Sequence, residues 1–301
     1  MSDPLKELKE FSYEGTTLAV IGDPINHSIS PQIHNAALGN LAFNDSQYDF
    51  WEYFRFNVPP IHLKEALKIF HDKEFLGLNL TIPHKVEALD YVVDMDPEAK
   101  LAGAVNTLKW RDDGYVGYNT DGFGIVNGIK KALDIEVAGS SVVLLGAGGA
   151  ARGAAFQFLA SGCSELWIGN RNQDNLKTLV EDVHGLNSDI PVHSFDIKDP
   201  PHLELPKEGV LVNATSLGLK KGDSAPINPS ILSKDLRVYD MIYNPKVTPF
   251  LSLCRDRGML SANGLSMLVF QGLRSLEIWT EDKVPEIPMM FAAIDAMDVL
   301  S

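Results

Sequence analysis

The sequence predicts an α/β protein of two domains, and three observations support this. The chain has 301 residues, about the length of two domains. Residues 142–145 form an unbroken apolar run that leads directly into the glycine-rich segment 146–149. Such a run is typical of a strand buried on both faces of a parallel sheet. Upstream, residues 16–93 alternate between strand-like and helix-like segments, which is the pattern of a separate α/β unit.

The composition is that of a globular protein, with 45% hydrophobic and 22% charged residues. Its net charge of -14 opposes binding to nucleic acids and to anionic membranes. Cys163 and Cys254 lack the spacing of a metal site, so we expect no metal and a reducing, cytoplasmic location. Residues 1–11 lack the apolar core of a signal peptide, and no window has the roughly 18 apolar residues of a membrane span.

The N-terminal part begins with a charged lead-in over residues 1–15. Strands are predicted at 16–21, 48–56 and 76–82, helices at 30–41, 60–70, 84–93 and 96–101, and a hairpin at 104–110 and 115–118. Asp112-Asp113-Gly114 supplies the hairpin turn, and Ser30 with Pro31 is predicted to cap the first long helix. The helix at 122–133, which Asp121 opens, is interpreted as the connector between the domains.

Gly146, Gly148 and Ala151 occupy the three positions of the dinucleotide-binding fingerprint. The first permits a tight turn, the second lets the backbone approach a diphosphate, and the third lets the helix pack close to its strand. A tight strand–helix turn without a ligand is the alternative. A strand at 165–170 ends at Asn170-Arg171, where an NAD site would have a carboxylate. A guanidinium at this place favours NADP over NAD, unless Arg171 is merely a solvated side chain.

Further helices are predicted at 173–183, 248–257, 265–280 and 288–300, and further strands at 192–195, 210–214 and 237–243. We expect the last two helices to return to the first domain. The expected domains are therefore a substrate-binding catalytic domain, 1–121 with 263–301, and a Rossmann-type NADP-binding domain, 122–262. The oligomeric state stays open between a monomer and a homodimer.

Lys85 and Asp121 are the candidates for acid–base chemistry. Lys85 follows an apolar strand, where partial desolvation would favour proton transfer near neutrality, although a solvated lysine is the commoner case. Asp121 lies at a helix N-terminus, where capping explains it equally well. Ser28 and Ser30 place two hydroxyls at a helix start, a natural cradle for a small carboxylate, or simply a turn and a cap.

Polar side chains also interrupt otherwise apolar segments and must find partners there. Either a bound polyhydroxy ligand or backbone groups could be these partners. The histidines His27, His34 and His84 do not have the spacing of a metal site. The interrupting residues are Asn79, Thr81, Asn106 and Gln271.

Nine motifs in the same order give the chain a resemblance to the shikimate dehydrogenase family between about residues 18 and 280. They are Pro24-Ile25-Asn26-His27-Ser28-Ile29-Ser30-Pro31, Asn79-Leu80-Thr81-Ile82-Pro83-His84-Lys85, Ala102-Gly103-Ala104-Val105-Asn106-Thr107, Asn119-Thr120-Asp121-Gly122, Gly146–Gly149, Asn170-Arg171, Asn213-Ala214-Thr215-Ser216, Tyr243-Asn244-Pro245 and Met267-Leu268-Val269-Phe270-Gln271.

The resemblance implies reversible, NADPH-dependent reduction of 3-dehydroshikimate to shikimate, in the pathway to aromatic amino acids. It implies that Lys85 and Asp121 are the catalytic pair. The substrate residues it implies are Ser28, Ser30, Asn79, Thr81, Asn106, Tyr243 and Gln271. The cofactor residues it implies are Gly146, Ala147, Gly148, Gly149, Ala150, Asn170, Arg171, Thr215, Ser216, Gly264 and Met267.

Departures from the family pattern bear on the cofactor. Asn172 and Asn175 stand where NADP-dependent members usually have threonine and a second basic residue, so mixed NADP and NAD use is credible. Ser266 replaces a frequent glycine, and we expect its side chain to crowd or hydrogen-bond the nicotinamide. Leu219 replaces a methionine of similar volume.

Two alternatives remain at the level of the sequence. A quinate or dual quinate/shikimate dehydrogenase of the same superfamily, using NAD or both cofactors, would share these motifs. A non-catalytic nucleotide-sensing protein on the same scaffold is a more remote alternative, because it predicts loss of Lys85 or Asp121, and both are present.

Overall fold

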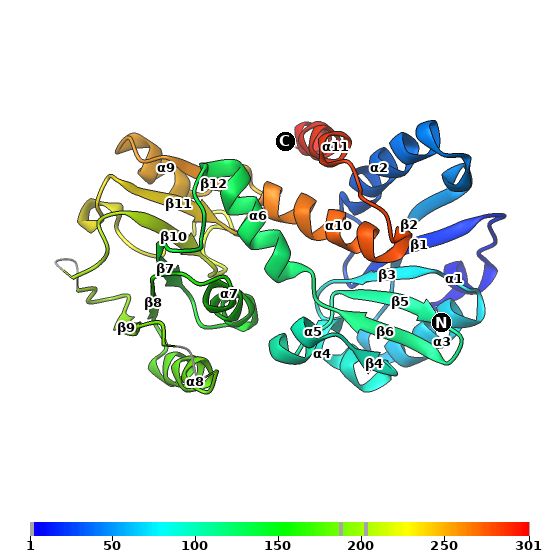
Figure 1. Ribbon diagram of the computed structural model, residues 1–301, viewed down its shortest axis with the longest axis horizontal. Coiled ribbons are helices and arrows are strands. Elements are labelled where there is room, and N and C mark those ends of the chain that lie inside the picture. Colours follow the sequence, from blue (N-terminus) through cyan, green and yellow to red (C-terminus); the bar gives the residue numbers. More distant parts are fainter. Residues whose placement is uncertain (1–2, 187–188, 202–203, 301) are drawn as a thin grey trace. The chain divides into compact units, whose positions relative to one another are not determined.

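The computed structural model describes residues 3–186, 189–201 and 204–300. The chain folds into two compact units (Figure 1). The first unit contains the chain up to Thr120 together with Gln271–Leu300, and the second contains Asp121–Phe270. The sequence places the first division one residue later, at 121/122, and the second at 262/263. In the structure, the second division falls at 270/271, inside helix α10 (Leu265–Thr280).

The first unit is built on a mixed six-stranded sheet with the order β2-β1-β3-β5-β6-β4. Strand β1 is parallel to β2 and β3, whereas β5 runs antiparallel to both β3 and β6. The elements are α1 (Lys6–Glu10), β1 (Thr16–Gly22), α2 (Ser30–Asn44), β2 (Trp51–Asn57), α3 (Leu63–Asp72), β3 (Gly77–Leu80), α4 (His84–Glu87), β4 (Asp94–Met95), α5 (Pro97–Ala102), β5 (Thr107–Arg111), β6 (Gly114–Tyr118) and α11 (Glu286–Leu300), with the second part of α10.

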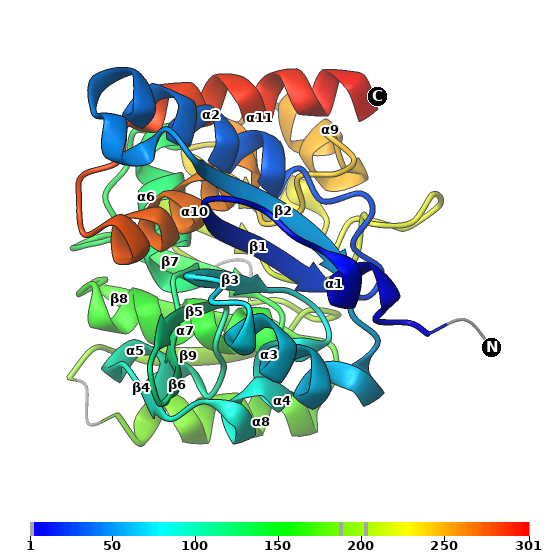
Figure 2. The same ribbon diagram turned by 90° about the vertical axis from the view of Figure 1, so that its right-hand side faces the viewer.

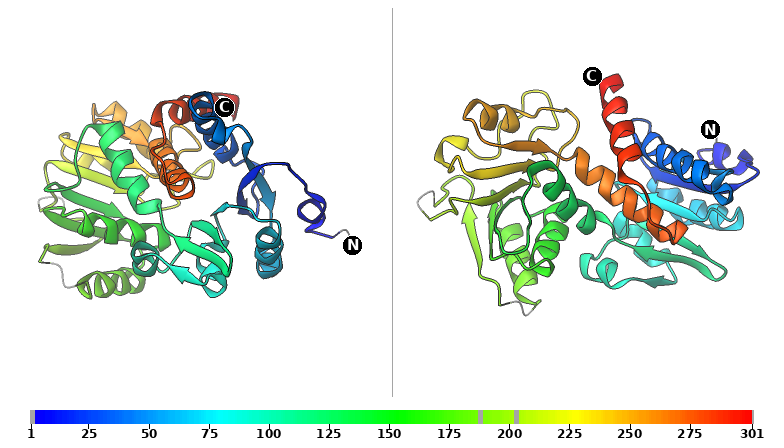
Figure 3. Two further views of the ribbon diagram at one scale, coloured as in Figure 1. Left: turned by 45° about the vertical axis from the view of Figure 1, so that its right-hand side comes forward. Right: turned by 45° about the horizontal axis from the view of Figure 1, so that its top comes forward.

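Helices cover both faces of this sheet, because alternate side chains of each strand point to opposite sides. Ala19 and Ile21 pack with Phe70 of α3 in a buried apolar cluster. On the opposite face, the ring of Tyr53 stacks on His34 of α2, with ring centroids 4.0 Å apart. Helices α2 and α11 run side by side over this face, as Figures 2 and 3 show from different directions.

The second unit is built on a parallel six-stranded sheet with the order β9-β8-β7-β10-β11-β12. Numbered within the unit, this is the order 3-2-1-4-5-6 of dinucleotide-binding α/β folds, which confirms the predicted fold class. Its elements are α6 (Asp121–Leu133), β7 (Ser141–Leu145), α7 (Gly149–Ala160), β8 (Glu165–Asn170), α8 (Gln173–His184), β9 (Val192–Asp196), β10 (Gly209–Asn213), β11 (Leu236–Asp240), α9 (Pro249–Asp256), β12 (Ser261–Asn263) and the start of α10.

The predicted central strand of this sheet is buried on both faces. Val142 and Leu144 belong to a buried apolar cluster with residues of α6, α7 and α8, whereas Val143 and Leu145 belong to another with residues of α9 and the segment before β11. All four residues are fully buried. The strand order changes direction between β7 and β10, and the carboxyl ends of strands at such a point are where these folds bind ligands.

Several predicted elements differ in detail. Strand 48–56 begins only at Trp51, because the Asp45 carboxylate accepts from the Gln47 N–H and starts a 3-10 turn at Ser46–Tyr48. The helix expected at 84–93 is α4 followed by a 3-10 turn, Ala88–Tyr91. The short strands β4 and β12 were not predicted. None of the described helices is both long and apolar enough to cross a membrane.

Candidate functional site

The glycine-rich segment after β7 forms an open, uncapped helix start. Gly146 has φ +118°, and a Cβ there would lie 3.1 Å from the main chain of Ala214 at the end of β10. Gly148 is the N-cap of α7 and supplies no side-chain cap, and residues 148–150 are exposed. Cβ atoms at Gly148 and Gly149 would meet nothing within 4 Å. The first N–H groups of α7 are therefore accessible to an anionic ligand.

The end of β8 carries the residues expected to select the cofactor. Arg171 is exposed at this strand end. The amide of Asn170 donates to the Asn172 carbonyl at 2.8 Å, and the Asn172 side chain accepts from the Asn175 N–H at 2.9 Å. Asn172 is thereby the N-cap of α8, which gives it a structural function that threonine also performs.

A buried carboxylate holds the loop after β10. Asp240, fully buried at the end of β11, accepts from the Asn213 amide at 3.0 Å and from the Thr248 hydroxyl at 2.6 Å. Asn213 in turn accepts from both the N–H and the hydroxyl of Thr215, at 3.0 and 2.8 Å. Burial raises the pKa of Asp240. The sequence analysis did not single out this residue, although a charged residue at the end of an apolar strand is a usable signal.

Ser266 points into the protein, which corrects the expectation that it would face the nicotinamide. Its hydroxyl donates to the Gly128 carbonyl at 3.0 Å and lies 2.9 Å from the Tyr239 phenol. The side chain is buried. Gly264, one turn before Leu268, is required by packing, because a Cβ there would lie 2.1 Å from the Met241 carbonyl oxygen.

Lys85 lies in the first turn of α4 and is half-buried. The turn is fixed on both sides of it. His84 is buried and contacts the Val58 carbonyl through Nε2 at 2.8 Å, and the Lys85 carbonyl accepts from the Val105 N–H at 2.8 Å. The methyl group of Thr81 packs against the backbone of Gly22, where a Cβ would lie 2.5 Å from it. Lys85 therefore lies on a turn, shortly after β3, that these contacts hold in place.

The two serines expected to form a carboxylate cradle lie together. The hydroxyl of Ser28 donates to that of Ser30 at 3.1 Å and accepts from the Ser30 N–H at 3.3 Å. Ser30 is the first helical residue, not the N-cap as predicted, because Ile29 takes the cap position. Ser28 also lines a cavity of ≈ 400 Å³ within the first unit, together with Arg55 and Asp295.

Asn79 is buried and its amide group is engaged inside the first unit. The carbonyl oxygen accepts from the Tyr53 hydroxyl at 2.7 Å. The two hydrogens of the NH2 group are shared among the Asn106 carbonyl, the Thr107 hydroxyl and the Ser275 hydroxyl, at 3.0 to 3.1 Å. These bonds hold the Asn79 amide within the first unit.

Asn106 joins two other candidates. Its Oδ1 accepts from the Thr120 N–H at 2.9 Å, and Thr120 directly precedes Asp121. Its Nδ2 lies 3.5 Å from the Oε1 of Gln271 on α10. The structure therefore links the Asn106 amide to Gln271 and to Thr120, the residue before Asp121.

Tyr243, three residues after β11, is half-buried, and burial raises the pKa of its phenol.

Comparison with known proteins decides the family. The model of the shikimate dehydrogenase substrate binding domain matches residues 20–108. The shikimate dehydrogenase (NADP(+)) of Methanopyrus kandleri is 34% identical over 287 residues, which are 94% of this chain and 96% of the relative. This chain belongs to the shikimate dehydrogenase family.

Solved structures agree over the same length. A shikimate dehydrogenase in complex with NADP+ superposes with a TM-score of 0.83 and 31% identity, covering 94% of this chain and 96% of that one. The Thermus thermophilus enzyme in complex with NADP(H) and shikimate has a TM-score of 0.80 and 31% identity, covering 93% and 99%. Within the family match at 20–108 lie Ser28, Ser30, Asn79, Thr81, Lys85 and Asn106.

Proposed function

We propose that this member of the shikimate dehydrogenase family catalyses the reversible, NADPH-dependent reduction of 3-dehydroshikimate to shikimate. The observation that carries the proposal is the similarity to NADP-dependent shikimate dehydrogenases along nearly the whole chain. The quinate alternative is not favoured, because the similar proteins described above are named for shikimate and NADP(+).

The residues at the end of β7 fit a dinucleotide. The exposed N–H groups at the start of α7 suit a diphosphate, and the open space beside Gly148 and Gly149 gives it room. The exposed guanidinium of Arg171, at the end of β8, is proposed to bind the 2′-phosphate. When bound, NADPH supplies a hydride for the carbonyl carbon of the substrate. The further residues proposed to hold it are Gly146, Ala147, Ala150, Asn170, Thr215, Ser216, Gly264 and Met267.

The hydroxyls of Ser28 and Ser30 suit the substrate carboxylate, because both can donate to its oxygens once Ser28 turns its proton away from Ser30. Amide and hydroxyl groups both donate and accept, as the hydroxyls of a polyhydroxy ring require. We therefore propose that Thr81, Asn106, Gln271 and Tyr243 bind the ring. Asn79 is proposed as a further member of this set, with its amide held in place by Tyr53, Asn106, Thr107 and Ser275.

Lys85 and Asp121 are proposed as the catalytic pair. In reduction, the Lys85 ammonium donates a proton to the oxygen of the former carbonyl, and in oxidation the neutral amine takes that proton back. The Asp121 carboxylate is proposed to accept a hydrogen bond from a ring hydroxyl and so to orient the substrate. The fixed turn around Lys85 supports this role, because a proton donor must be held within hydrogen-bonding reach of its acceptor.

Initial rates measured with shikimate and with quinate, each with NADP+ and with NAD+, test the proposal. We expect the highest kcat/KM for shikimate with NADP+. A higher kcat/KM for quinate would contradict the substrate assignment, and a higher value with NAD+ would contradict the role of Arg171. No oxidation of either compound would contradict the enzymatic assignment.

We also propose a cytoplasmic location. Cys163 and Cys254 are both free and buried. Burial raises the pKa of Cys163 to about 11 and that of Cys254 to about 12, so both thiols remain protonated near neutrality. Buried, unreactive thiols are typical of proteins in reducing compartments.

A further inference from the structure

The hydroxyl of Ser275 on α10 lies at the centre of a buried polar cluster. It lies 3.0 Å from the Asn79 amide of β3, 2.8 Å from the Thr107 hydroxyl of β5 and 3.3 Å from the Thr120 hydroxyl. It donates to the carbonyl of Gln271, one helical turn earlier, at 3.0 Å. Ser275 and Thr107 are fully buried, and Thr120 and Asn79 are buried.

The hydrogen positions in this cluster follow from donor counting. The Gln271 carbonyl can only accept, so the single proton of Ser275 goes to it, and the Ser275 oxygen accepts from Asn79. The second lone pair of Ser275 accepts from one threonine hydroxyl. The proton of the other threonine goes to Oδ1 of Asn106, which lies 3.0 Å from Thr107 and 3.2 Å from Thr120. Every hydroxyl in the cluster thus has an acceptor.

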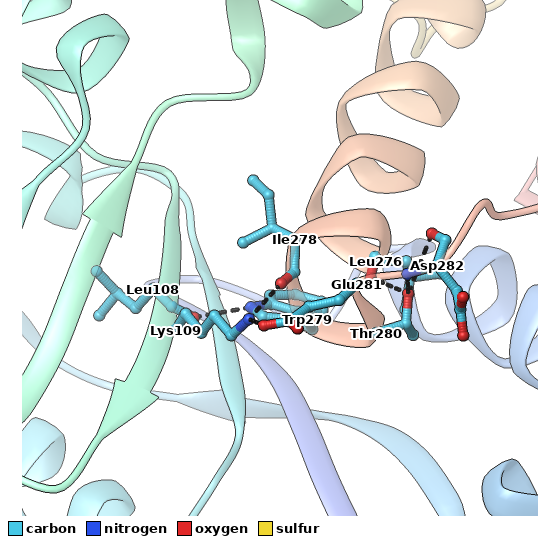
Figure 4. A network of polar contacts seen from close by, with 8 residues as sticks. All are labelled: Leu108, Lys109, Leu276, Ile278, Trp279, Thr280, Glu281 and Asp282. Carbon is cyan, nitrogen blue, oxygen red and sulfur yellow. Dashed lines mark hydrogen bonds and ion pairs between the residues drawn. The ribbon is translucent and has the colours of Figure 1, made fainter.

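The far end of α10 has an anchor of its own. Trp279 donates to the Leu108 carbonyl at 2.9 Å, and the Lys109 ammonium donates to the Ile278 carbonyl at 2.8 Å and pairs with Glu281 (Figure 4). These contacts lie about two turns from Gln271. The link from Gln271 to Asn106 is 3.5 Å long, at the weak end of hydrogen-bond geometry. Between the anchor at Trp279 and Gln271, the bonds of Ser275 to β3 and β5 hold α10 one turn from Gln271.

We propose that Ser275 is a positioning residue, which holds Gln271 in register with Asn106 and with Thr120, the residue before Asp121. The inference rests on the proposed function, since it assigns Gln271 and Asn106 to substrate binding. It goes beyond that function because Ser275, a fully buried residue, belongs to none of the motifs that indicated the family.

The variant Ser275→Ala tests this without leaving a buried donor unpaired. The two amide hydrogens of Asn79 retain the Asn106 carbonyl and the Thr107 hydroxyl as acceptors, and the threonine hydroxyl that donates to Ser275 can turn to Asn106 Oδ1, which lies within 3.2 Å of both threonines. The fold is therefore retained, while α10 loses its bonds to β3 and β5 at this turn. A contact that Gln271 makes equally with bound substrate and transition state affects KM alone, so we expect KM for shikimate to rise about ten-fold with kcat changed by less than about two-fold.

A matched control is available on the same helix. Thr280 donates to the Leu276 carbonyl, four residues earlier, at 2.8 Å, as Ser275 donates to the Gln271 carbonyl. Thr280, however, lies at the far end of α10 (Figure 4). Thr280→Val should leave the KM for shikimate unchanged. KM for NADP+ should be unchanged in both variants. In a Gln271→Ala background, Ser275→Ala should change KM for shikimate by less than about two-fold, because coupled residues are not additive.

The outcomes separate the two proposals. Calorimetric binding of shikimate is measured beside turnover, so that binding is followed even without catalysis. A wild-type protein that neither oxidises nor binds shikimate overturns the proposed function and this inference together. An active wild type with an unchanged KM in Ser275→Ala overturns the inference alone. It is equally overturned if the Ser275→Ala effect is undiminished in the Gln271→Ala background, or if KM for NADP+ rises in parallel.

Discussion

The phenolic oxygen of Tyr239 lies 2.9 Å from the hydroxyl of Ser266 and accepts from the Met267 N–H at 3.0 Å. Because Ser266 gives its own proton to Gly128, the Tyr239 proton goes to Ser266. Burial raises the pKa of Tyr239 to about 12, so the phenol keeps that proton throughout the physiological range. The start of α10 is thereby tied to β11 and α6 by one directed chain of hydrogen bonds.

This arrangement predicts that Ser266→Ala affects stability and leaves cofactor binding unchanged. Removing the hydroxyl leaves the buried Tyr239 proton without its acceptor, which costs about 1–3 kcal/mol. Urea unfolding should show this loss, while KM for NADP+ stays within about two-fold of the wild type. Ser252→Ala, an exposed serine on α9, is the control and should change neither. A markedly altered KM for NADP+ with unchanged stability would show that Ser266 faces the nicotinamide after all.

We expect Lys85→Ala to lower kcat at least by the factor that general acid–base catalysis contributes, which is on the order of 10² to 10⁴. KM for shikimate should change little, because the proposed proton transfer occurs only in the transition state. Steady-state rates in both directions measure this, with Lys64→Ala, an exposed lysine of α3, as control. Near-full turnover in Lys85→Ala would remove Lys85 from the mechanism.

Cofactor choice is expected to follow the charge at the end of β8. Arg171→Ala removes a charge-assisted contact to the 2′-phosphate, so KM for NADPH should rise about ten-fold or more with little change for NADH. Asn175→Arg restores a second cation and should lower KM for NADPH. Lys177→Ala is the control, because Lys177 pairs with Glu181 on α8. Equal effects of Arg171→Ala on the two cofactors would contradict the assignment.

The sequence predicted the second unit better than the details of the site, for a physical reason. The apolar run at 142–145 and the glycines after it determine the local backbone geometry directly. The strand β7 and the helix α7 can therefore be predicted from residues that are close in sequence. The orientation of Ser266 depends on Tyr239, which is distant in sequence but lies beside it in the fold. A local pattern cannot reveal such a contact.

The same distinction applies to the first unit. Asn79 was recognised as a polar residue in an apolar strand, and the structure gives its partners as Tyr53, Thr107 and Ser275. These partners come from β2, β5 and α10, so only the folded sheet brings them together. The motif resemblance predicted the candidate residues, and the hydrogen bonds show how the fold holds the amide of Asn79.

Gly148→Val tests the open start of α7. A Cβ at Gly148 would meet no protein atom within 4 Å, and its φ of -89° is accessible to any residue. The variant should therefore fold with a small capping cost of about 1 kcal/mol or less. A bound diphosphate would meet the new side chain, so KM for NADPH should rise about ten-fold or more. Gly153→Ala, in the same helix and also facing open space, should leave that KM unchanged. Unaltered NADPH binding in Gly148→Val would place the diphosphate elsewhere.

His34 predicts a specific acid sensitivity of the first unit. Its Nδ1 donates to the Ser30 carbonyl at 2.8 Å, and complete burial lowers its pKa from 6.5 to about 4. The unfolded chain therefore binds a proton at His34 between pH 6.5 and about 4 that the folded protein does not, so stability falls as the pH falls through this window. Between pH 7.5 and 5 this amounts to about 2 kcal/mol.

His34→Asn removes the titrating group and keeps a donor for Ser30. It should be less stable than the wild type at pH 7.5, yet lose about 2 kcal/mol less on transfer to pH 5. Urea unfolding at the two pH values measures the difference, and His27→Asn, an exposed histidine before Ser28, should show the wild-type pH dependence. The variant removes only the buried imidazole from titration. If His34→Asn nevertheless loses as much stability as the wild type between these pH values, protonation of another group causes the acid sensitivity.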